Sequence, residues 1–227
     1  DQFPFIDPPR SSSVREGYQT LHELGAIDVH AELTKVGRAL AKMPVDPRLG
    51  RMILEAQQEG SLREVLIIAA ALATQDPRLR PLDSAKLADV QHARFNDERS
   101  DFMSFIKLWD FFHESRGELS GSKLRRLCQQ QFISYIRMRE WIDVHAQLHA
   151  LASESGMKVN PLPASYDAVH RAVLAGLLGN VGTRHDASTY LGVRDRKFSI
   201  FPGSGLFKNG PRWMMAAEVV ETTKLYG

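Results

Sequence analysis

The chain has 227 residues, is 43% hydrophobic and 25% charged, and carries a formal net charge of +2, which predicts a folded protein with a substantial core and excludes a disordered polyelectrolyte. Its single cysteine, Cys128, excludes an internal disulfide, and its longest apolar run is well short of the about 20 residues that span a bilayer. We therefore expect a cytoplasmic protein without a membrane span. The excess of positive charge falls in residues 158–227, where it favours an anionic partner.

The first fifty residues predict an extended linker and a winged-helix domain (residues 1–50). Three prolines hold residues 3–9 extended, and this segment lacks an initiator Met and a basic signal region, so we expect the chain to be part of a longer polypeptide. Helical spacing over residues 14–24, hairpin-like alternation over 26–33 and a short helix over 34–42 follow. Helix, hairpin and helix in this order are typical of a winged helix.

Residues 51–160 predict a helical bundle. Asp46 followed by a proline marks a helix start, and residues 61–64 (Ser-Leu-Arg-Glu) form a capping box ahead of an apolar run. Residues 100–112 place large apolar side chains every three or four positions, as on the core face of a helix. The longest periodic segment, residues 122–155, predicts one long helix.

Residues 161–227 predict one more helix followed by a small barrel. Helical spacing ends near residue 178, and the alternation over residues 189–193, 197–202 and 213–225 predicts strands separated by turns. These are fewer strands than the five of an OB-fold, so we expect a partial OB-like barrel whose final strands are missing. The predicted fold class is therefore mainly α with a C-terminal β-barrel: a winged helix, a helical bundle and an OB-like barrel.

Three stretches of the chain carry a resemblance to a known family. They are Phe5–Pro9 with Met43–Pro47, Ser100–Trp109 with Phe132–Tyr135, and Phe198–Leu206 with Pro211–Trp213 and Glu221–Tyr226. Here the chain resembles the C-terminal region of DEAH-box ATP-dependent RNA helicases, and most closely the bacterial HrpA type. Many eukaryotic members have Asn and Arg at the positions of Ser134 and Ile136 and a His-Pro-Ser-Ser motif at residues 201–204, so roles attributed to those side chains do not transfer.

The resemblance implies that a winged helix, a ratchet-like bundle and an OB-fold pack on motor domains of the same polypeptide and close a tunnel around single-stranded RNA. A motor needs a P-loop lysine and an acidic Mg²⁺ site, and the chain contains no Gly-Lys-Ser or Gly-Lys-Thr sequence. We therefore expect ATP and Mg²⁺ to belong to the missing motor domains. This chain alone is expected to hold no cofactor or metal ion, to contain no catalytic residue and to be inactive as an ATPase.

Cationic side chains with nearby aromatic rings are the chemistry that holds a single-stranded polyanion. The alternative for any one of them is a solvated basic face, and for Arg139 it is an ion pair with Glu140 or Asp143. Tyr135 and Trp141 are predicted to be core residues. The candidate nucleic-acid-binding residues are Arg125, Arg126, Arg137, Arg139, Arg184, His185, Tyr190, Arg194, Arg196, Lys197 and Lys208.

Other chemistries are less favoured by the sequence. His145 and His149 have the spacing of paired metal ligands on a helix, but no third ligand stands near them in the sequence. Cys128 lies among leucines, where a lone thiol is typically a small buried hydrophobe.

Two rival functions belong to other classes. The first is a protein-interaction module that docks a helicase activator or a ribosomal component without touching nucleic acid. The second, a self-contained DNA-binding winged helix, is disfavoured because residues 1–50 are slightly acidic and major-groove recognition needs a basic face.

Overall fold

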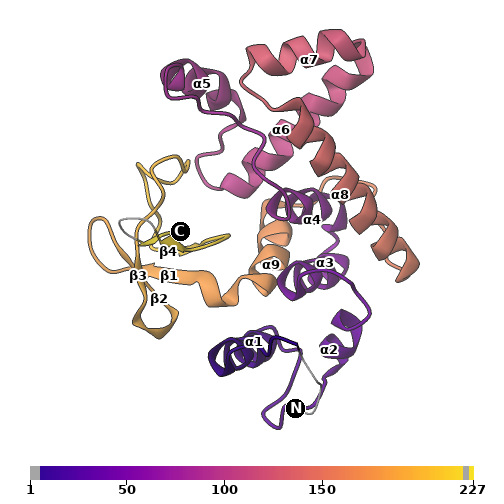
Figure 1. Ribbon diagram of the computed structural model, residues 1–227, viewed down its shortest axis with the longest axis vertical. Coiled ribbons are helices and arrows are strands. Elements are labelled where there is room, and N and C mark those ends of the chain that lie inside the picture. Colours follow the sequence, from indigo (N-terminus) through magenta and orange to yellow (C-terminus); the bar gives the residue numbers. More distant parts are fainter. Residues whose placement is uncertain (1–5, 222–224) are drawn as a thin grey trace.

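The computed structural model describes residues 6–221 and 225–227, which form an N-terminal arm, a helical body and a small sheet (Figure 1). In Figure 1 the arm lies below the body, and the sheet lies to its left. Phe5 and residues 222–224, which carry part of the family resemblance, lie outside the described residues.

The N-terminal arm contains the two helices that the winged-helix prediction requires. Thr34 caps the second helix, because its hydroxyl accepts a hydrogen bond from the backbone N–H three residues further on and donates one, of 2.6 Å, to the carbonyl of Gly25. Gly25 itself has a φ of 67°, which glycine adopts without strain just after a helix. The predicted hairpin is reduced to one bridge between Ile27 and Leu33. The helices are α1 (Ser11–Glu23) and α2 (Lys35–Leu40).

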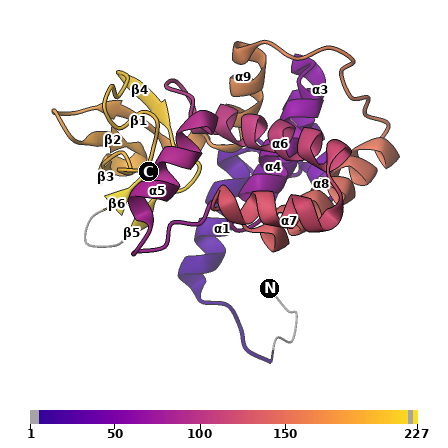
Figure 2. The same cartoon turned by 90° about the horizontal axis from the view of Figure 1, so that it is seen from above.

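The helical body is built around α4, in which residues 65–71 are all buried. A helix that is apolar on every side must be surrounded, and α3, α6, α8 and α9 pack against it (Figure 2). Within the described part of the chain, no helix combines the length and the apolar character needed to cross a bilayer. The helices are α3 (Pro47–Glu59), α4 (Leu62–Leu72), α5 (Ala85–His92), α6 (Asp101–Glu118), α7 (Gly121–Gln130), α8 (Tyr135–Glu154) and α9 (Tyr166–Gly176).

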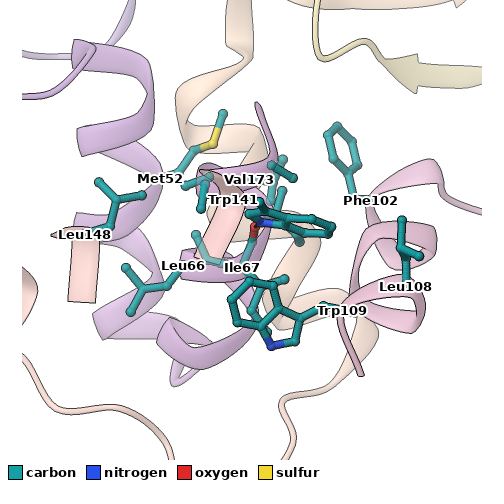
Figure 3. Close-up of a cluster of buried hydrophobic side chains, with 14 of the residues drawn as sticks. Met52, Leu66, Ile67, Phe102, Leu108, Trp109, Trp141, Leu148 and Val173 are labelled. Atoms are coloured by element: carbon teal, nitrogen blue, oxygen red, sulfur yellow. Dashed lines mark hydrogen bonds between the residues drawn. The ribbon is translucent and has the colours of Figure 1, made fainter. Parts of the chain in front are cut away.

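Two tryptophans and one hydrogen bond hold α8 and α6 to this central helix (Figure 3). Trp141 of α8 is fully buried, and its indole N–H donates a 3.0 Å hydrogen bond to the carbonyl of Ile67 on α4. The ring of Trp109 on α6 lies 5.3 Å from that of Trp141 between centroids, a tilted contact that contributes about 0.5–1.5 kcal/mol beyond the burial of area. The predictions of a core Trp141 and of a buried aromatic face on α6 are confirmed.

The single long helix predicted over residues 122–155 is wrong, because the segment forms two helices, α7 and α8. Phe132 between them has a φ of 53°, which a helix does not allow. The break is held by a distant segment: the N–H of Ser134 donates to the carbonyl of Pro77, and the N–H of Leu79 donates to the carbonyl of Phe132. Ser134 also caps α8 with its side chain. Since apolar spacing continues on both sides of the break, the periodicity alone does not reveal it.

The capping box predicted at residues 61–64 is also wrong. Ser61 makes no cap bond, and its hydroxyl donates instead to the carbonyl of Ala168 at 3.4 Å. The buried carboxylate of Glu64 accepts from the Asn160 side chain at 3.0 Å and from the Ala164 N–H at 3.2 Å. The loop before α9 and the first turn of α9 thus bind the side chains that would otherwise cap α4, and these bonds fix the loop to the body.

The C-terminal sheet is open, which corrects the predicted barrel. Four antiparallel strands have the order β3-β2-β1-β4, so β3 and β4 are edges, and among the described residues nothing pairs one edge with the other. A separate pair, β5 with β6, touches the four-stranded sheet through one bridge, between Ser199 and Tyr226. The predicted strand over 213–225 is therefore divided. The strands are β1 (Val181–Arg184), β2 (Tyr190–Gly192), β3 (Lys197–Phe198), β4 (Trp213–Met215), β5 (Val220–Glu221) and β6 (Leu225–Tyr226).

The central strand β1 was not among the predicted strands, and its glycine explains why. Gly182 faces Gly192 across the β1–β2 pair. A side chain at Gly182 would lie 2.7 Å from the ring of Phe198, so the paired glycines make room for that ring. Glycine weakens the strand signal in the sequence, although here it is required by packing.

Replacing Gly176 with Ala should destabilise the body. Gly176 of α9 sits against α3, and an added Cβ would clash with the carbonyl of Arg48 and the side chain of Met52. We expect Gly176→Ala to lower the free energy of unfolding by about 1–3 kcal/mol, measured by urea denaturation. Gly117→Ala is the matched control, because Gly117 lies in α6 with nothing near its Cβ position, and it should be neutral or stabilising by up to about 1 kcal/mol. Equal effects of the two changes would contradict the close α3–α9 contact.

His145 gives the body a pH-dependent stability. Its ring lies 4.5 Å from that of Trp109, and His113 stacks on the same indole at 4.2 Å. Burial, followed by the charges of His149 and His113, lowers the pKa of His145 to about 4. The unfolded chain therefore takes up a proton at a higher pH than the folded chain does, and stability present near pH 7 is lost as the pH falls toward 4.

We expect the urea midpoint to fall between pH 7 and pH 5, and His145→Gln to reduce that fall. The neutral amide cannot be protonated, so the proton uptake that favours unfolding is removed at this position. His30→Gln, at an exposed position in the N-terminal arm, is the control and should retain the wild-type pH dependence. The assignment fails if His145→Gln has the pH dependence of the unmodified chain.

Candidate nucleic-acid interface

The four-stranded sheet has one buried face and one open face. Residues paired across antiparallel strands point to the same side, so Tyr190 and Phe198 share a face with each other, and both are buried with Met214 in a small core of their own. On the opposite face, one residue from each strand contributes to a row that crosses the sheet. The row consists of Lys197, Leu191, Thr183 and Trp213. Its two end residues, Lys197 and Trp213, are exposed.

A cleft of about 310 Å³ lies at the other side of the sheet. Arg184 and Lys208 line it, together with the exposed ring of Phe207 and the side of Tyr226. The guanidinium of Arg184 donates to the carbonyl of Gly210, which fixes the cation at the wall. None of the described residues that line the cleft is acidic, so its electrostatic potential favours an anion.

Asp186 is close in sequence to Arg184 of the cleft, and its carboxylate already accepts hydrogen bonds from its own loop. The Thr189 hydroxyl, followed by the backbone N–H of Ser188, lowers the pKa of Asp186 to about 2. Asp186 also accepts the N–H of Thr189 at 2.9 Å, which closes the loop between β1 and β2. The carboxylate therefore organises this loop through hydrogen bonds.

The predicted cations at the tip between β2 and β3 differ in their surroundings. Arg194 donates a 2.7 Å hydrogen bond to Glu23 of α1, an ion pair that ties the sheet to the N-terminal arm. Arg196 and Lys197 are exposed and have no ion-pair partner among the described residues. The tip itself is a tight turn, since Arg194 and Asp195 have φ values of 63° and 57°.

The predicted arginines of the bundle lie around the junction of α7 and α8. Arg137 donates a 2.9 Å hydrogen bond to the carbonyl of Asp76, so it holds the loop after α4. Arg125 stacks on the ring of Tyr135 at 5.2 Å, and Arg139, followed by Arg125, lowers the pKa of that phenol by hydrogen bonding. Tyr135 is half-buried under these cations, which is less than the core position predicted for it.

Arg126 and Arg139 are exposed at the same junction. The ion pair considered for Arg139 with Glu140 or Asp143 is absent from the described part of the chain. The bundle junction and the sheet lie at different ends of the molecule in both views (Figures 1 and 2), so this chain does not bring the two groups of cations together.

Two further candidates of the sheet differ in their availability. His185 is exposed at the end of β1. Tyr190 is only 3% exposed, and its hydroxyl donates a 2.6 Å hydrogen bond to the carbonyl of Pro211, so its ring is committed to the core of the sheet. The exposed aromatic rings of this part of the chain are instead Phe201, Phe207 and Trp213, which were not among the candidates. The signal for Trp213 was its place at the start of an alternating strand, where register alone decides which side it faces.

The structure offers no other chemistry at these residues. No group of three potential metal-ligating side chains occurs within residues 6–221 and 225–227. Cys128 is buried, and burial raises its pKa to about 11, so the thiol is a core group as predicted. A larger hollow of about 880 Å³ lies between α3 and α8, but its walls are mostly apolar and Arg48 is the one cation among its described lining residues.

Three family models match separate parts of the chain, in order along the sequence. Residues 18–45 match "Helicase associated domain (HA2), winged-helix", residues 46–105 match "Helicase associated domain (HA2), ratchet-like", and residues 169–227 match "Oligonucleotide/oligosaccharide-binding (OB)-fold". Together with the arm, the body and the open sheet, these matches define the class: a helicase-associated region made of winged-helix, ratchet-like and OB-fold units.

Whole-length similarity then gives the family. The chain is 46% identical to the Escherichia coli ATP-dependent RNA helicase HrpA, over 99% of this chain and 18% of the relative. It is 43% identical to the Haemophilus influenzae HrpA homolog, over 100% of this chain and 18% of the relative. It is 27% identical to the human probable ATP-dependent RNA helicase DHX35, over 99% of this chain and 32% of the relative. The chain corresponds to a helicase-associated segment of the DEAH-box RNA helicases of the HrpA type. It spans less than a fifth of the length of these bacterial relatives.

Proposed function

We propose that this chain is the accessory region of an ATP-dependent DEAH-box RNA helicase and that it guides single-stranded RNA during unwinding. The proposal is supported by the similarity to RNA helicases along the whole chain and by the cationic cleft of the sheet, where Arg184 and Lys208 stand without an acidic lining residue among those described. The motor domains of the same polypeptide are its permanent partners. ATP and Mg²⁺ bind those domains, and this chain has no ATPase site of its own.

The cleft has the chemistry of a backbone contact. Arg184 is fixed by its bond to Gly210 and retains donors for a phosphate, whereas Lys208 supplies a compact point charge to the lining of the same cleft. Phosphate contacts of this kind do not depend on the base and weaken with salt, because binding releases counterions. Such contacts suit a strand of any sequence that passes through the site.

Further cations lie at one edge of the sheet, on β3 and in the turn before it. Arg196 and Lys197 are free to contact a strand that leaves the cleft, whereas Arg194 must first give up its bond to Glu23. Among the cations of this turn, we therefore assign the RNA contacts to Arg196 and Lys197, and we assign to Arg194 the role of holding α1 against the sheet.

One observation supports the second candidate function, docking of a protein activator or a ribosomal component. Leu82, Leu87 and Val90 on and before α5 are 98%, 63% and 68% exposed, and the last two share one helical face. Exposed aliphatic side chains gathered on one short helix are typical of a protein contact. This surface lies on a different element from the cleft, so the two functions make separate predictions.

Replacing both cleft cations should weaken RNA binding. We expect Arg184→Ala with Lys208→Ala to lower the affinity of the chain for a uridine 12-mer by about tenfold at low salt, because two phosphate contacts are lost. The slope of log affinity against log salt should become shallower by about 1.4, since each contact to a single strand contributes about 0.7. Fluorescence anisotropy of a labelled oligonucleotide measures both quantities.

The matched control removes the same number of charges elsewhere. Lys35 and Lys42 lie in the N-terminal arm and are exposed. Lys35→Ala with Lys42→Ala should leave the affinity and the slope unchanged. A cleft variant that binds like the control would remove the cleft from the site, and a chain that binds no RNA at any salt concentration would leave protein docking as the function.

A further inference from the structure

Trp213 is the exposed tryptophan of this chain. Its side chain is 60% exposed, whereas Trp109 is 8% exposed and Trp141 is fully buried. No aromatic ring stacks on it and no hydrogen bond engages its indole N–H within residues 6–221 and 225–227. A tryptophan normally stabilises a protein by being buried, and an exposed indole does not contribute in this way. Its exposed position therefore favours a role in binding a ligand.

The register of the sheet places this ring at one end of an open row. Trp213 pairs with Thr183, Thr183 pairs with Leu191, and Leu191 pairs with Lys197, so the four residues cross the sheet on one face. With neighbouring strands about 4.8 Å apart, Lys197 and Trp213 are separated by about 14 Å across that face. The row thus has a flat aromatic ring at one end, a cation at the other and two uncharged residues between them.

The helical body covers only the adjoining part of this face. Met215 lies two residues after Trp213 on the same side of β4 and packs against the core of the body. Trp213 is therefore held on a strand that is anchored at its C-terminal end, while its own ring is exposed and is not part of the body's core. A rigid backbone beneath an open ring is the arrangement that a stacking platform requires.

We propose that Trp213 is a base-stacking platform for single-stranded RNA and that Lys197 holds a phosphate of the same strand. This inference rests on the proposed function and adds a second contact surface, on the side of the sheet opposite the Arg184–Lys208 cleft. The charge of Lys197 fits a polyanion, and no member of the row is acidic. The indole face accepts any base, so the contact is independent of sequence.

Intrinsic fluorescence tests the proposal directly, because two of the three tryptophans are buried. Titrating the chain with a uridine 12-mer should quench the solvent-exposed component of the emission, and Trp213→Phe should abolish the quenching while it retains most of the affinity. Trp213→Leu should weaken binding by about fivefold or more without changing the salt dependence, because stacking releases no counterions. Lys197→Ala should instead make the slope of log affinity against log salt shallower by about 0.7.

Two controls separate stacking from loss of structure and from loss of charge. An abasic oligomer with the same phosphate backbone should bind the wild-type chain and Trp213→Leu equally, since it has no base to stack. Leu87→Ala removes an exposed apolar side chain from α5 and should leave RNA affinity unchanged. The melting temperature of Trp213→Leu should match that of the wild type, because the ring is exposed.

The outcomes distinguish this inference from the proposed function. If the uridine 12-mer binds and the Arg184/Lys208 variant weakens it, but the wild-type emission is not quenched and Trp213→Leu binds with the wild-type affinity, then the platform is wrong and the proposed function stands. If the wild-type chain binds neither the uridine nor the abasic oligomer, both are overturned.

Discussion

The burial of α4 is the constraint on which the rest of the helical body depends. An apolar helix exposed on any side would lose a large part of its stabilisation, at about 25 cal/mol per Å² of apolar surface returned to water. Four helices surround it, and Trp141 fastens the longest of them with a bond to the carbonyl of Ile67. Since α9 is one of the four and leads directly into β1, the packing of α4 also fixes where the sheet begins.

Local signals in the sequence predicted local structure well. Asp46 caps α3 through the N–H of Arg48, and Thr34 caps α2, both where the sequence places them. Cap residues act within one helical turn, so their neighbours in the chain contain the information that decides them. The same holds for the core face of α6, which requires only the spacing of apolar residues along one helix.

Two of the wrong predictions share one cause, which is competition from distant segments. The break between α7 and α8 depends on hydrogen bonds to residues 77–79. The lost capping box depends on Ala168 of α9, which binds Ser61, and on the loop at 160–164, which binds Glu64. The barrel prediction failed because strand spacing shows how many strands form but not whether the last closes on the first. For the helix break and the capping box, the deciding partner is about fifty to a hundred residues away, beyond the reach of any sequence window.

For the candidate site too, the sequence predicted the composition but not the geometry. The basic character of the C-terminal part was evident in the sequence, but the partner that engages Arg194, Glu23, is 171 residues away. Tyr190 and Trp213 were both aromatic residues in predicted strands, and only the register buries the first and exposes the second. A one-residue shift of pairing would exchange these faces, so sequence alone could not choose between the rings.

Under the proposed function, the cleft and the face with Trp213 are two separate contact surfaces, and their separation affects how a moving RNA strand is held and released. A phosphate contact in the cleft weakens with salt and is indifferent to the base, whereas stacking on Trp213 is indifferent to salt and to base identity. Neither contact is strong alone, so each can be released as the motor advances the strand by one step. Two weak contacts on one rigid sheet keep the strand in place through their combined effective concentration, because one holds while the other exchanges. A single tight site of the same total affinity would instead have to be broken at every step, and it would oppose the movement that it is meant to guide.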